Sequence, residues 1–263
     1  MFPVLLELGP LRIFTYGFFL AIAFLSAIYV SAREAGRLGL PVSRFYDLCF
    51  YIVLAALIGS RLAYVFLDLK TFLANPLKIF ALWEGGLVFQ GGVALAIITA
   101  LFYMRMHGLP WRTCLDALGL GTPVGQFFGR IGCFMAGCCY GAPSDLPWAV
   151  TFLHSQSLCP IKEPIHPAQL YEAFLALGVF GVLNMVKTRK RFDGQLILTY
   201  FALAGLVRFT VEFFRHPGDY RGPALFGWMP LTQAVALALA VVCSGLALWW
   251  GRRSPGAGRT MER

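Results

Sequence analysis

The chain has 263 residues, with 22 Lys and Arg against 13 Asp and Glu, which gives a formal net charge of +9. Hydrophobic residues make up 58% and charged residues only 13%, whereas soluble domains are typically about 45–50% apolar and about 25% charged. This composition excludes a disordered or fibrous chain and argues against a nucleic-acid-binding protein. It indicates one polytopic membrane domain with little soluble mass.

Seven apolar segments are close to the roughly 20 residues that a helix needs to cross a bilayer. In chain order they are Phe14–Ala32, Phe45–Leu67, Leu87–Met104, Leu115–Gly132, Ala168–Val186, Gly194–Phe214 and Trp228–Trp250. The fourth has the weakest hydropathy, since it is rich in glycine and carries Asp116 at its start. Because a spanning segment must satisfy its own backbone hydrogen bonds, we predict an all-α membrane protein with seven transmembrane helices. A single membrane domain over residues 1–250 and a mobile cytoplasmic tail over residues 251–263 are expected.

The positive charges predict the orientation of these helices. With the N-terminus outside, thirteen Lys and Arg fall in inside segments, six fall in outside segments and three lie within spans. The positive-inside rule therefore places the N-terminus outside and the C-terminus in the cytoplasm. The longest outside segment, Cys133–Pro167, is predicted to form a small head or a re-entrant lid. No cationic region precedes the first apolar run, which is too long for a typical signal peptide, so we interpret it as a retained span.

Ionisable residues within the apolar segments are costly in a membrane, so each is expected to have a pairing or functional role. They are Asp47, Arg61, Asp116, Arg130, Glu172, Arg208 and Glu212. A structural ion pair, or snorkelling to the headgroup region, is the alternative for any one of them. Three arginines in one small bundle favour an anion site, because the planar guanidinium suits phosphate.

Two patterns surround these arginines. Arg208, Glu212 and Arg215 are spaced i, i+4, i+7, which predicts one helix face where Glu212 orients two guanidiniums and one positive charge remains. A structural salt-bridge ladder is the alternative. Before Arg130, glycines at i, i+4 and i+8 form a smooth strip for a neighbouring backbone or a lipid tail. The glycines of this region are Gly121, Gly125, Gly129, Gly132, Gly137 and Gly141.

The segment Gly129–Gly141, GRIGCFMAGCCYG, resembles the signature of the bacterial prolipoprotein diacylglyceryl transferases. The order of further matching motifs and the seven-span layout agree with this family from about residue 10 to residue 250. These motifs are Tyr16-Gly17, Gly59–Arg61 with Tyr64, Gly85–Gly92, Asp116, His166–Glu172 and Arg208–Arg215.

The resemblance implies an enzyme of the bacterial inner membrane whose substrates are phosphatidylglycerol and the signal peptide of a prolipoprotein. Such enzymes move the diacylglyceryl group to the thiol of the lipobox cysteine and release glycerol 1-phosphate, with no metal, cofactor or nucleic acid involved. By this resemblance the expected catalytic residues are Arg130, Arg208 and Gln90. The expected substrate-binding residues are Arg130 and Arg208 again, with Tyr16, Arg61, Asp116, Cys133, Cys138, Gly141, Glu212 and Arg215.

The sequence departs from the family pattern at several polar positions. Gln90 stands where the family commonly has histidine, and glutamine cannot act as a base at neutral pH. Cys133 replaces an asparagine, Cys138 replaces an acidic residue and Ala204 replaces a tyrosine. A divergent member that binds or moves lipid, or that uses another acceptor, is therefore the alternative function.

The seven cysteines are an odd number, so they cannot all pair within the chain. The spacing of Cys133, Cys138 and Cys139 does not match common zinc patterns. A metal site with Cys159, His154 and His166 is one alternative for this group. The others are a disulfide from Cys159 to a signature cysteine in an oxidising periplasm and a lipid-carrying nucleophile at Cys138. Packing or polar lining is the favoured interpretation.

Overall fold

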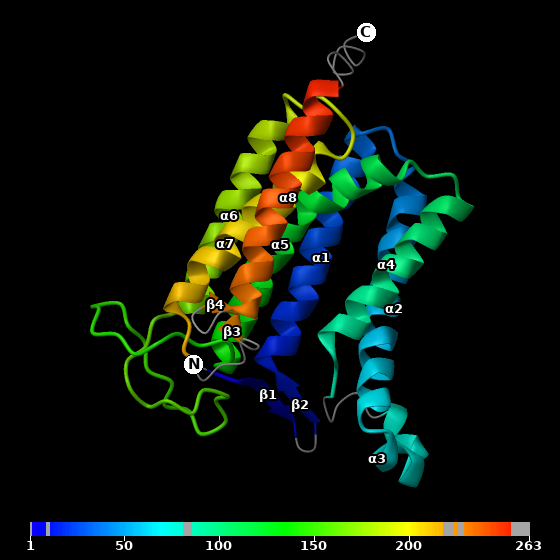
Figure 1. Ribbon diagram of the computed structural model, residues 1–263. Helices are drawn as coiled ribbons and strands as arrows, with labels where there is room; N and C mark the ends of the chain where they lie inside the picture. The colour runs from blue at the N-terminus through cyan, green and yellow to red at the C-terminus, as the bar shows by residue number, and fades with distance from the viewer. Residues whose placement is uncertain (1, 9–10, 81–85, 218–223, 226–228, 254–263) are drawn as a thin grey trace. The chain divides into compact units, whose positions relative to one another are not determined.

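A computed structural model of the chain describes residues 2–8, 11–80, 86–217, 224–225 and 229–253, which are predominantly helical (Figure 1). Six helices are long and apolar enough to cross a membrane, which makes the chain a multi-pass membrane protein. They are α1 (Thr15–Arg37), α2 (Val42–Leu67), α4 (Phe89–Met106), α6 (Ala168–Lys187), α7 (Gln195–Val211) continued by the 3₁₀ turn η3 (Glu212–Phe214), and α8 (Leu231–Arg253).

The fourth predicted segment also forms a helix, α5 (Trp111–Ala136), but it is less apolar than the other six. No residue from Thr113 to Ala136 is exposed, and Cys114, Asp116 and Ala117 are fully buried. A helix that other helices surround does not need an apolar surface towards lipid. Its weak hydropathy therefore follows from its central position.

The expectation of a purely α-helical chain needs a small correction. Two short antiparallel strand pairs are present: β1 (Val4–Leu8) with β2 (Leu11–Phe14), and β3 (Ala224–Leu225) with β4 (Met229–Pro230). Residues 254–263 of the predicted tail and Trp228 of the last predicted span lie outside the described residues. The described chain forms two compact units, one of Met1–Glu34 with Leu115–Arg263 and one of Ala35–Cys114.

In the unit Ala35–Cys114, α2 and α4 pack backbone against backbone at three glycines. A Cβ on Gly59 would lie 2.5 Å from the carbonyl oxygen of Gly91, and one on Gly92 would lie 2.8 Å from that of Ala56. Small residues allow this approach, which explains the glycine pair that follows Gln90. Gln90 itself lies exposed in the first turn of α4.

Arg61 anchors the connection that follows α2 in the same unit. This connection contains α3 (Leu69–Ala74) and the 3₁₀ turn η1 (Pro76–Phe80). The buried Arg61 guanidinium donates from Nε to the Ile79 carbonyl at 2.9 Å and from Nη1 to the Gly86 carbonyl at 3.1 Å. These contacts satisfy an otherwise costly buried charge.

In the other unit, α5 packs on α1 along the predicted glycine strip. A Cβ on Gly121 would meet the Ala27 carbonyl oxygen at 2.3 Å, and one on Gly125 would meet that of Ala23 at 3.1 Å. A Cβ on Gly129 would meet nothing within 4 Å, so the strip opens where Arg130 follows. Helices α6 and α7 pack around a core of Leu120, Val179, Leu183, Leu196 and Tyr200.

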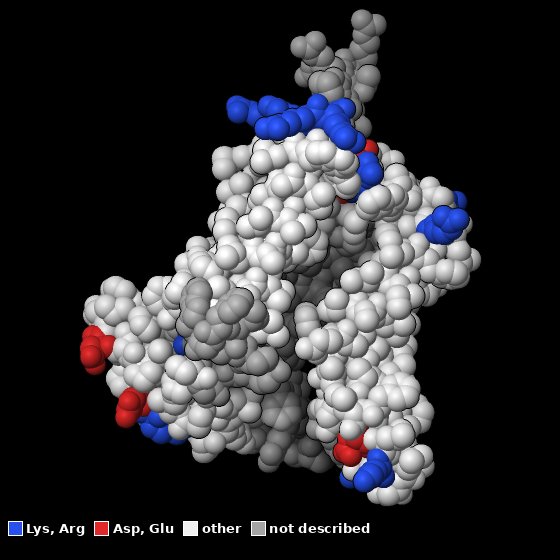
Figure 2. Space-filling model, in the orientation of Figure 1, with Lys and Arg blue, Asp and Glu red and all other residues white. Residues whose placement is uncertain are grey.

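The two ends of this unit differ in chemistry (Figures 1 and 2). The loop that joins α5 to α6 has its own apolar core of Phe152, Cys159 and Ile165, closed by a backbone pairing of Val150 with Ile165. At the opposite end, where α6 and α8 finish, Lys and Arg gather over the surface in Figure 2. They include Lys187, Arg189, Arg191, Arg252 and Arg253.

Candidate active site

Four charged side chains from three helices form a continuous chain of ion pairs. Arg130 Nη2 of α5 lies 2.7 Å from Glu172 Oε1 of α6, and Glu172 Oε2 lies 3.8 Å from Arg208 Nη1 of α7. Arg208 Nη2 lies 2.8 Å from Oε2 of Glu212 in η3. Glu172 therefore stands between the two arginines that the sequence singled out and holds both guanidiniums in place.

The exposure of these side chains shows which charges face outward. The side chains of Glu172 and Glu212 are 10% and 1% exposed, whereas those of Arg130 and Arg208 are 24% and 23% exposed. The carboxylates are thus covered and the two arginine side chains are partly exposed, with Arg208 Nη1 buried and left without a hydrogen bond among the described residues. Such an unused donor of a charged group suits a site that binds an anion.

Arg215 joins this cluster by a different route from the predicted one. The prediction of a helix face from Arg208 to Arg215 is wrong, since α7 ends at Val211, η3 follows, and Arg215 has extended backbone (φ −83°, ψ 149°). The chain leaves the helix just before Pro217, where proline disfavours helical backbone at the preceding residue. With Arg215, this region holds three arginines and two glutamates, so one formal positive charge remains.

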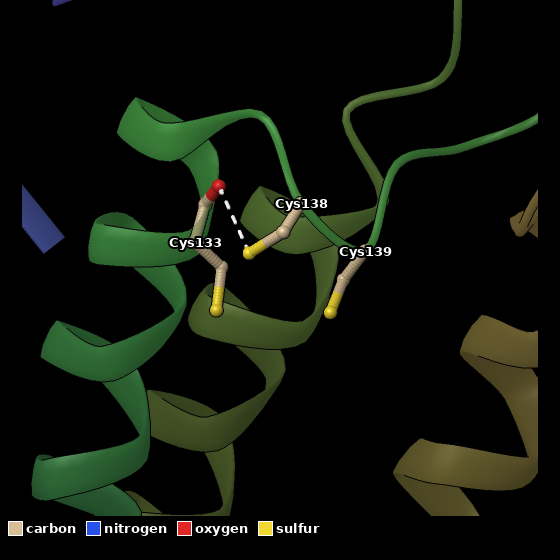
Figure 3. A group of neighbouring side chains, drawn as sticks. All are labelled: Cys133, Cys138 and Cys139. Carbon is tan, nitrogen blue, oxygen red and sulfur yellow. Dashed lines mark hydrogen bonds between the residues drawn. The ribbon is translucent and has the colours of Figure 1, made fainter. Parts of the chain in front are cut away.

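The end of α5 carries the cysteines of the signature segment. Gly137, with φ +83°, ends the helix in the left-handed conformation, and its N–H donates to the Cys133 carbonyl at 2.9 Å. The chain then turns back, so that Cys138 and Cys139 lie beside Cys133 (Figure 3). Gln169 Nε2 of α6 donates to the Cys138 carbonyl at 2.8 Å and holds this turn against α6.

The two cysteines of this turn differ in acidity. Hydrogen bonds from the Cys133 and Cys138 thiols, and then the charges of Arg130 and Arg215, lower the pKa of Cys139 well below its usual range. Hydrogen bonds with Cys133 and Cys139 raise the pKa of the Cys138 thiol far above its usual range. A raised pKa disfavours the thiolate form that a nucleophilic Cys138 would need.

The cysteine alternatives can be compared with the structure. All seven cysteines are free, and the Cys159 thiol donates to the Ile161 carbonyl at 3.6 Å, so the alternative disulfide from Cys159 to a signature cysteine is not formed. Burial raises the pKa of Cys159. Among the described residues, the group of potential metal ligands consists of Cys133, Cys138 and Cys139 and includes neither His154 nor His166.

Two further predicted site residues, Tyr16 and Gly141, lie next to this region. Gly132 of α5 packs on the first turn of α1, where its Cβ position is 3.4 Å from the Tyr16 ring. Gly141 pairs its backbone with Arg215, and a Cβ there would lie 2.2 Å from the carbonyl oxygen of His166. Gly141 thereby lets the signature loop, the entry to α6 and the exit from α7 meet.

Replacing Gly141 with alanine is expected to destabilise this meeting point, because the added methyl group would overlap a backbone oxygen that cannot rotate away. Overpacking of this kind typically costs about 1–3 kcal/mol. The midpoint of thermal unfolding in detergent measures the effect. Gly178→Ala is the matched control, since a Cβ there meets nothing within 4 Å. Equal stability of the two variants would contradict the assigned role.

Asp116 is not brought together with Arg130. It is fully buried and accepts hydrogen bonds from Gly194 N at 2.8 Å and Ile197 N at 3.1 Å, and Lys190 Nζ lies 2.9 Å away. It precedes Arg130 by 14 residues, which corresponds to about 21 Å along a helix. These contacts favour a role for Asp116 in anchoring the start of α7 over a role in binding the same anion as Arg130. Arg61 and Gln90 belong to the other compact unit.

Glu172 and Cys139 are site residues that the sequence prediction missed. Glu172 was expected, as an embedded charge, to have a pairing or functional role but was not assigned to the site. An embedded carboxylate in a bundle with embedded arginines is the signal that could have assigned it. For Cys139 the signal is three cysteines within seven residues, which a turn can bring together.

These features define a multi-pass helical membrane protein with a cluster of arginine–glutamate ion pairs between its helices. A family model described as prolipoprotein diacylglyceryl transferase matches residues 3–251. The chain therefore belongs to the prolipoprotein diacylglyceryl transferase family, as the motifs had predicted.

Three relatives show how far this similarity extends. The phosphatidylglycerol–prolipoprotein diacylglyceryl transferase of Geobacter sulfurreducens is 34% identical over 258 residues, covering 97% of each chain. The protein of the same name from Nitratidesulfovibrio vulgaris strain DP4 is 36% identical over 261 residues, covering 94% of this chain and 92% of its own. That of Coxiella burnetii strain RSA 331 is 36% identical over 261 residues, covering 95% of each chain.

Proposed function

We propose that this protein transfers the diacylglyceryl group of phosphatidylglycerol to the lipobox cysteine of prolipoproteins. The observation that carries the proposal is the pair of partly exposed arginines, Arg130 and Arg208, held by the covered carboxylates Glu172 and Glu212. The printed names of the relatives, which share nearly the whole chain, give the substrates.

In the proposed reaction the lipobox thiol loses its proton to solvent and its thiolate attacks the diacylglyceryl carbon next to the phosphate. A carbon–sulfur bond forms as the carbon–oxygen bond breaks, and the electron pair leaves with glycerol 1-phosphate. Arg130 and Arg208 bind the phosphate oxygens and stabilise the charge that develops there. Tyr16, Cys133, Cys138, Glu212 and Arg215 line this site, and Gly141 shapes its loop. Arg61 and Gln90, which lie in the other compact unit, are proposed as functional residues on the family resemblance alone.

The direct test combines the purified protein, phosphatidylglycerol and a synthetic lipobox peptide. The expected result is a peptide whose mass rises by one diacylglyceryl group, with an equal amount of glycerol 1-phosphate released. A lipobox peptide with serine in place of cysteine is the control. Retention of phosphatidylglycerol without any modified peptide would reject the transfer and favour a protein that only binds or moves lipid.

The proposal includes seven membrane spans, with α5 as the seventh, in a bacterial inner membrane with the N-terminus periplasmic and the C-terminus cytoplasmic. The loop between α5 and α6 is then a periplasmic head on the side where the substrate arrives. We expect a tag inserted near Pro143 to be accessible from outside intact cells and one near Lys187–Arg191 to be protected. Labelling of the latter from outside would overturn this orientation.

The proposed mechanism also predicts a pH dependence without a dedicated base. A thiol has an unperturbed pKa near 8.5, so only a few per cent is thiolate at pH 7, and nearby guanidiniums favour the charged form. The thiolate fraction rises with pH up to the pKa, so transfer should increase between roughly pH 6 and 8.5 and then level off.

Gln90 would then position lipid or thiol through its amide. Gln90→Ala should reduce transfer moderately at every pH, and Gln90→His should be tolerated. Initial rates across this pH range with saturating lipid measure both effects. Abolition of transfer by Gln90→Ala, or by Cys138→Ser together with a lipid thioether trapped on the wild-type enzyme, would contradict the substrate-thiolate mechanism.

A further inference from the structure

We propose that Cys133, Cys138 and Cys139 form a binding site for a soft, thiophilic metal ion, and that Cu(I) fits it best. The three sulfur atoms lie within 4.8 Å of one another, and Figure 3 shows the three side chains next to one another at the end of α5 and in the turn that follows it. This inference does not rest on the proposed lipid transfer.

The local backbone is arranged to bring the sulfurs together. Gly137 ends α5, and the N–H groups of both Gly137 and Cys138 donate to the Cys133 carbonyl, at 2.9 and 3.2 Å. Cys139 has φ +57° and is the one non-glycine residue with positive φ among those the structure describes. This conformation costs roughly 1–2 kcal/mol for a residue with a Cβ. With this backbone conformation the Cys139 sulfur lies within 4.8 Å of those of Cys133 and Cys138.

The distances suit a three-coordinate ion. With metal–sulfur bonds of about 2.3 Å, as zinc makes with cysteine, a trigonal ion separates its sulfur ligands by about 4.0 Å. Sulfurs that already lie within 4.8 Å need to shift by less than about 1 Å to reach this arrangement. Cys133 is buried and the other two are partly accessible, so the ion has a route of entry.

The chemistry selects the ion. Thiolates are soft ligands that favour Cu(I) and zinc. Structural zinc sites take four protein ligands, whereas the group found in the described residues supplies three, a number that satisfies Cu(I). Three thiolates around Cu(I) carry two net negative charges. The guanidiniums of Arg130 and Arg215 lie close enough to interact electrostatically with Cys139 and would offset this charge. Each thiol that still holds a proton releases it on binding, and no oxidation state changes.

The test uses the full-length protein in detergent, reduced anaerobically with a phosphine, and titrated with Cu(I) against a chromogenic Cu(I) chelator. We expect one tightly held Cu(I) per chain, with X-ray absorption showing sulfur ligands only. Replacing any one of the three cysteines with serine should weaken binding at least about 10-fold, in line with the loss of a ligand. Cys243→Ser, which removes a buried cysteine of α8, is the matched control and should bind as the wild type does.

A second variant distinguishes loss of a metal ligand from loss of folding. Cys139→Gly removes a ligand but suits the left-handed backbone, so this protein should unfold at the same or a higher temperature and still lose Cu(I). Two outcomes would overturn the proposal. One is a wild-type protein that competes no better than the triple serine variant. The other is a Cys139→Gly protein that is folded and retains its Cu(I).

Discussion

Replacing Arg130 with alanine is expected to lower the rate of diacylglyceryl transfer by about 100–1,000-fold, the usual effect of losing one donor to a developing charge. Arg130 is the guanidinium next to the opening at Gly129, and its Nη2 is held at 2.7 Å by Glu172. Lysine at this position should restore little activity. Its ammonium is a point charge and cannot bind two phosphate oxygens in a bidentate way as the planar guanidinium does.

The rate should be measured with the lipobox peptide on protein whose folding has been verified by thermal unfolding. Arg112→Ala provides a control on the same helix, because Arg112 is exposed at the start of α5, against Trp111. A folded Arg130→Ala protein with near-normal transfer would show that another group binds the headgroup phosphate.

Replacing Glu172 with glutamine is the second change with a large expected effect. The amide keeps the shape of the side chain but removes the charge that separates and orients Arg130 and Arg208. The two guanidiniums would then repel each other, and a misplacement of about 1 Å costs roughly 100-fold in rate. We expect this loss mainly in kcat, together with reduced stability, since breaking a buried pair typically costs about 3–5 kcal/mol.

A merely structural role for Glu172 would lower the amount of folded protein without changing the activity of each folded molecule. Steady-state kinetics corrected for the folded fraction distinguish this case from a positioning role. Glu163→Gln is the control for removal of one carboxylate from the same unit, since Glu163 is exposed in the loop before α6. Unchanged kcat in folded Glu172→Gln protein would remove Glu172 from the site.

The helices of this protein follow closely from its sequence. The seven apolar segments agree with α1, α2, α4, α5, α6, α7 with η3, and α8, because hydropathy is a local property that a membrane selects directly. The weakest segment is α5, and the structure gives the reason: it is covered by protein along its length. The glycine strip likewise predicted a close approach, which α1 makes at Gly121 and Gly125.

The sequence by itself determined the membrane class and the family, since these are encoded in composition and in contiguous motifs, and it supplied the arginines of the proposed site as candidates. Only the tertiary structure decided their partners. Glu172 of α6 pairs with Arg130 of α5 and with Arg208 of α7. Asp116 accepts a hydrogen bond from Gly194 at the start of α7, 78 residues further along the chain. The close approach of the three cysteines depends on two left-handed residues, Gly137 and Cys139. Spacing along a helix reports neighbours on that helix alone, whereas ion pairs between helices arise from packing, which brings together residues far apart in the chain.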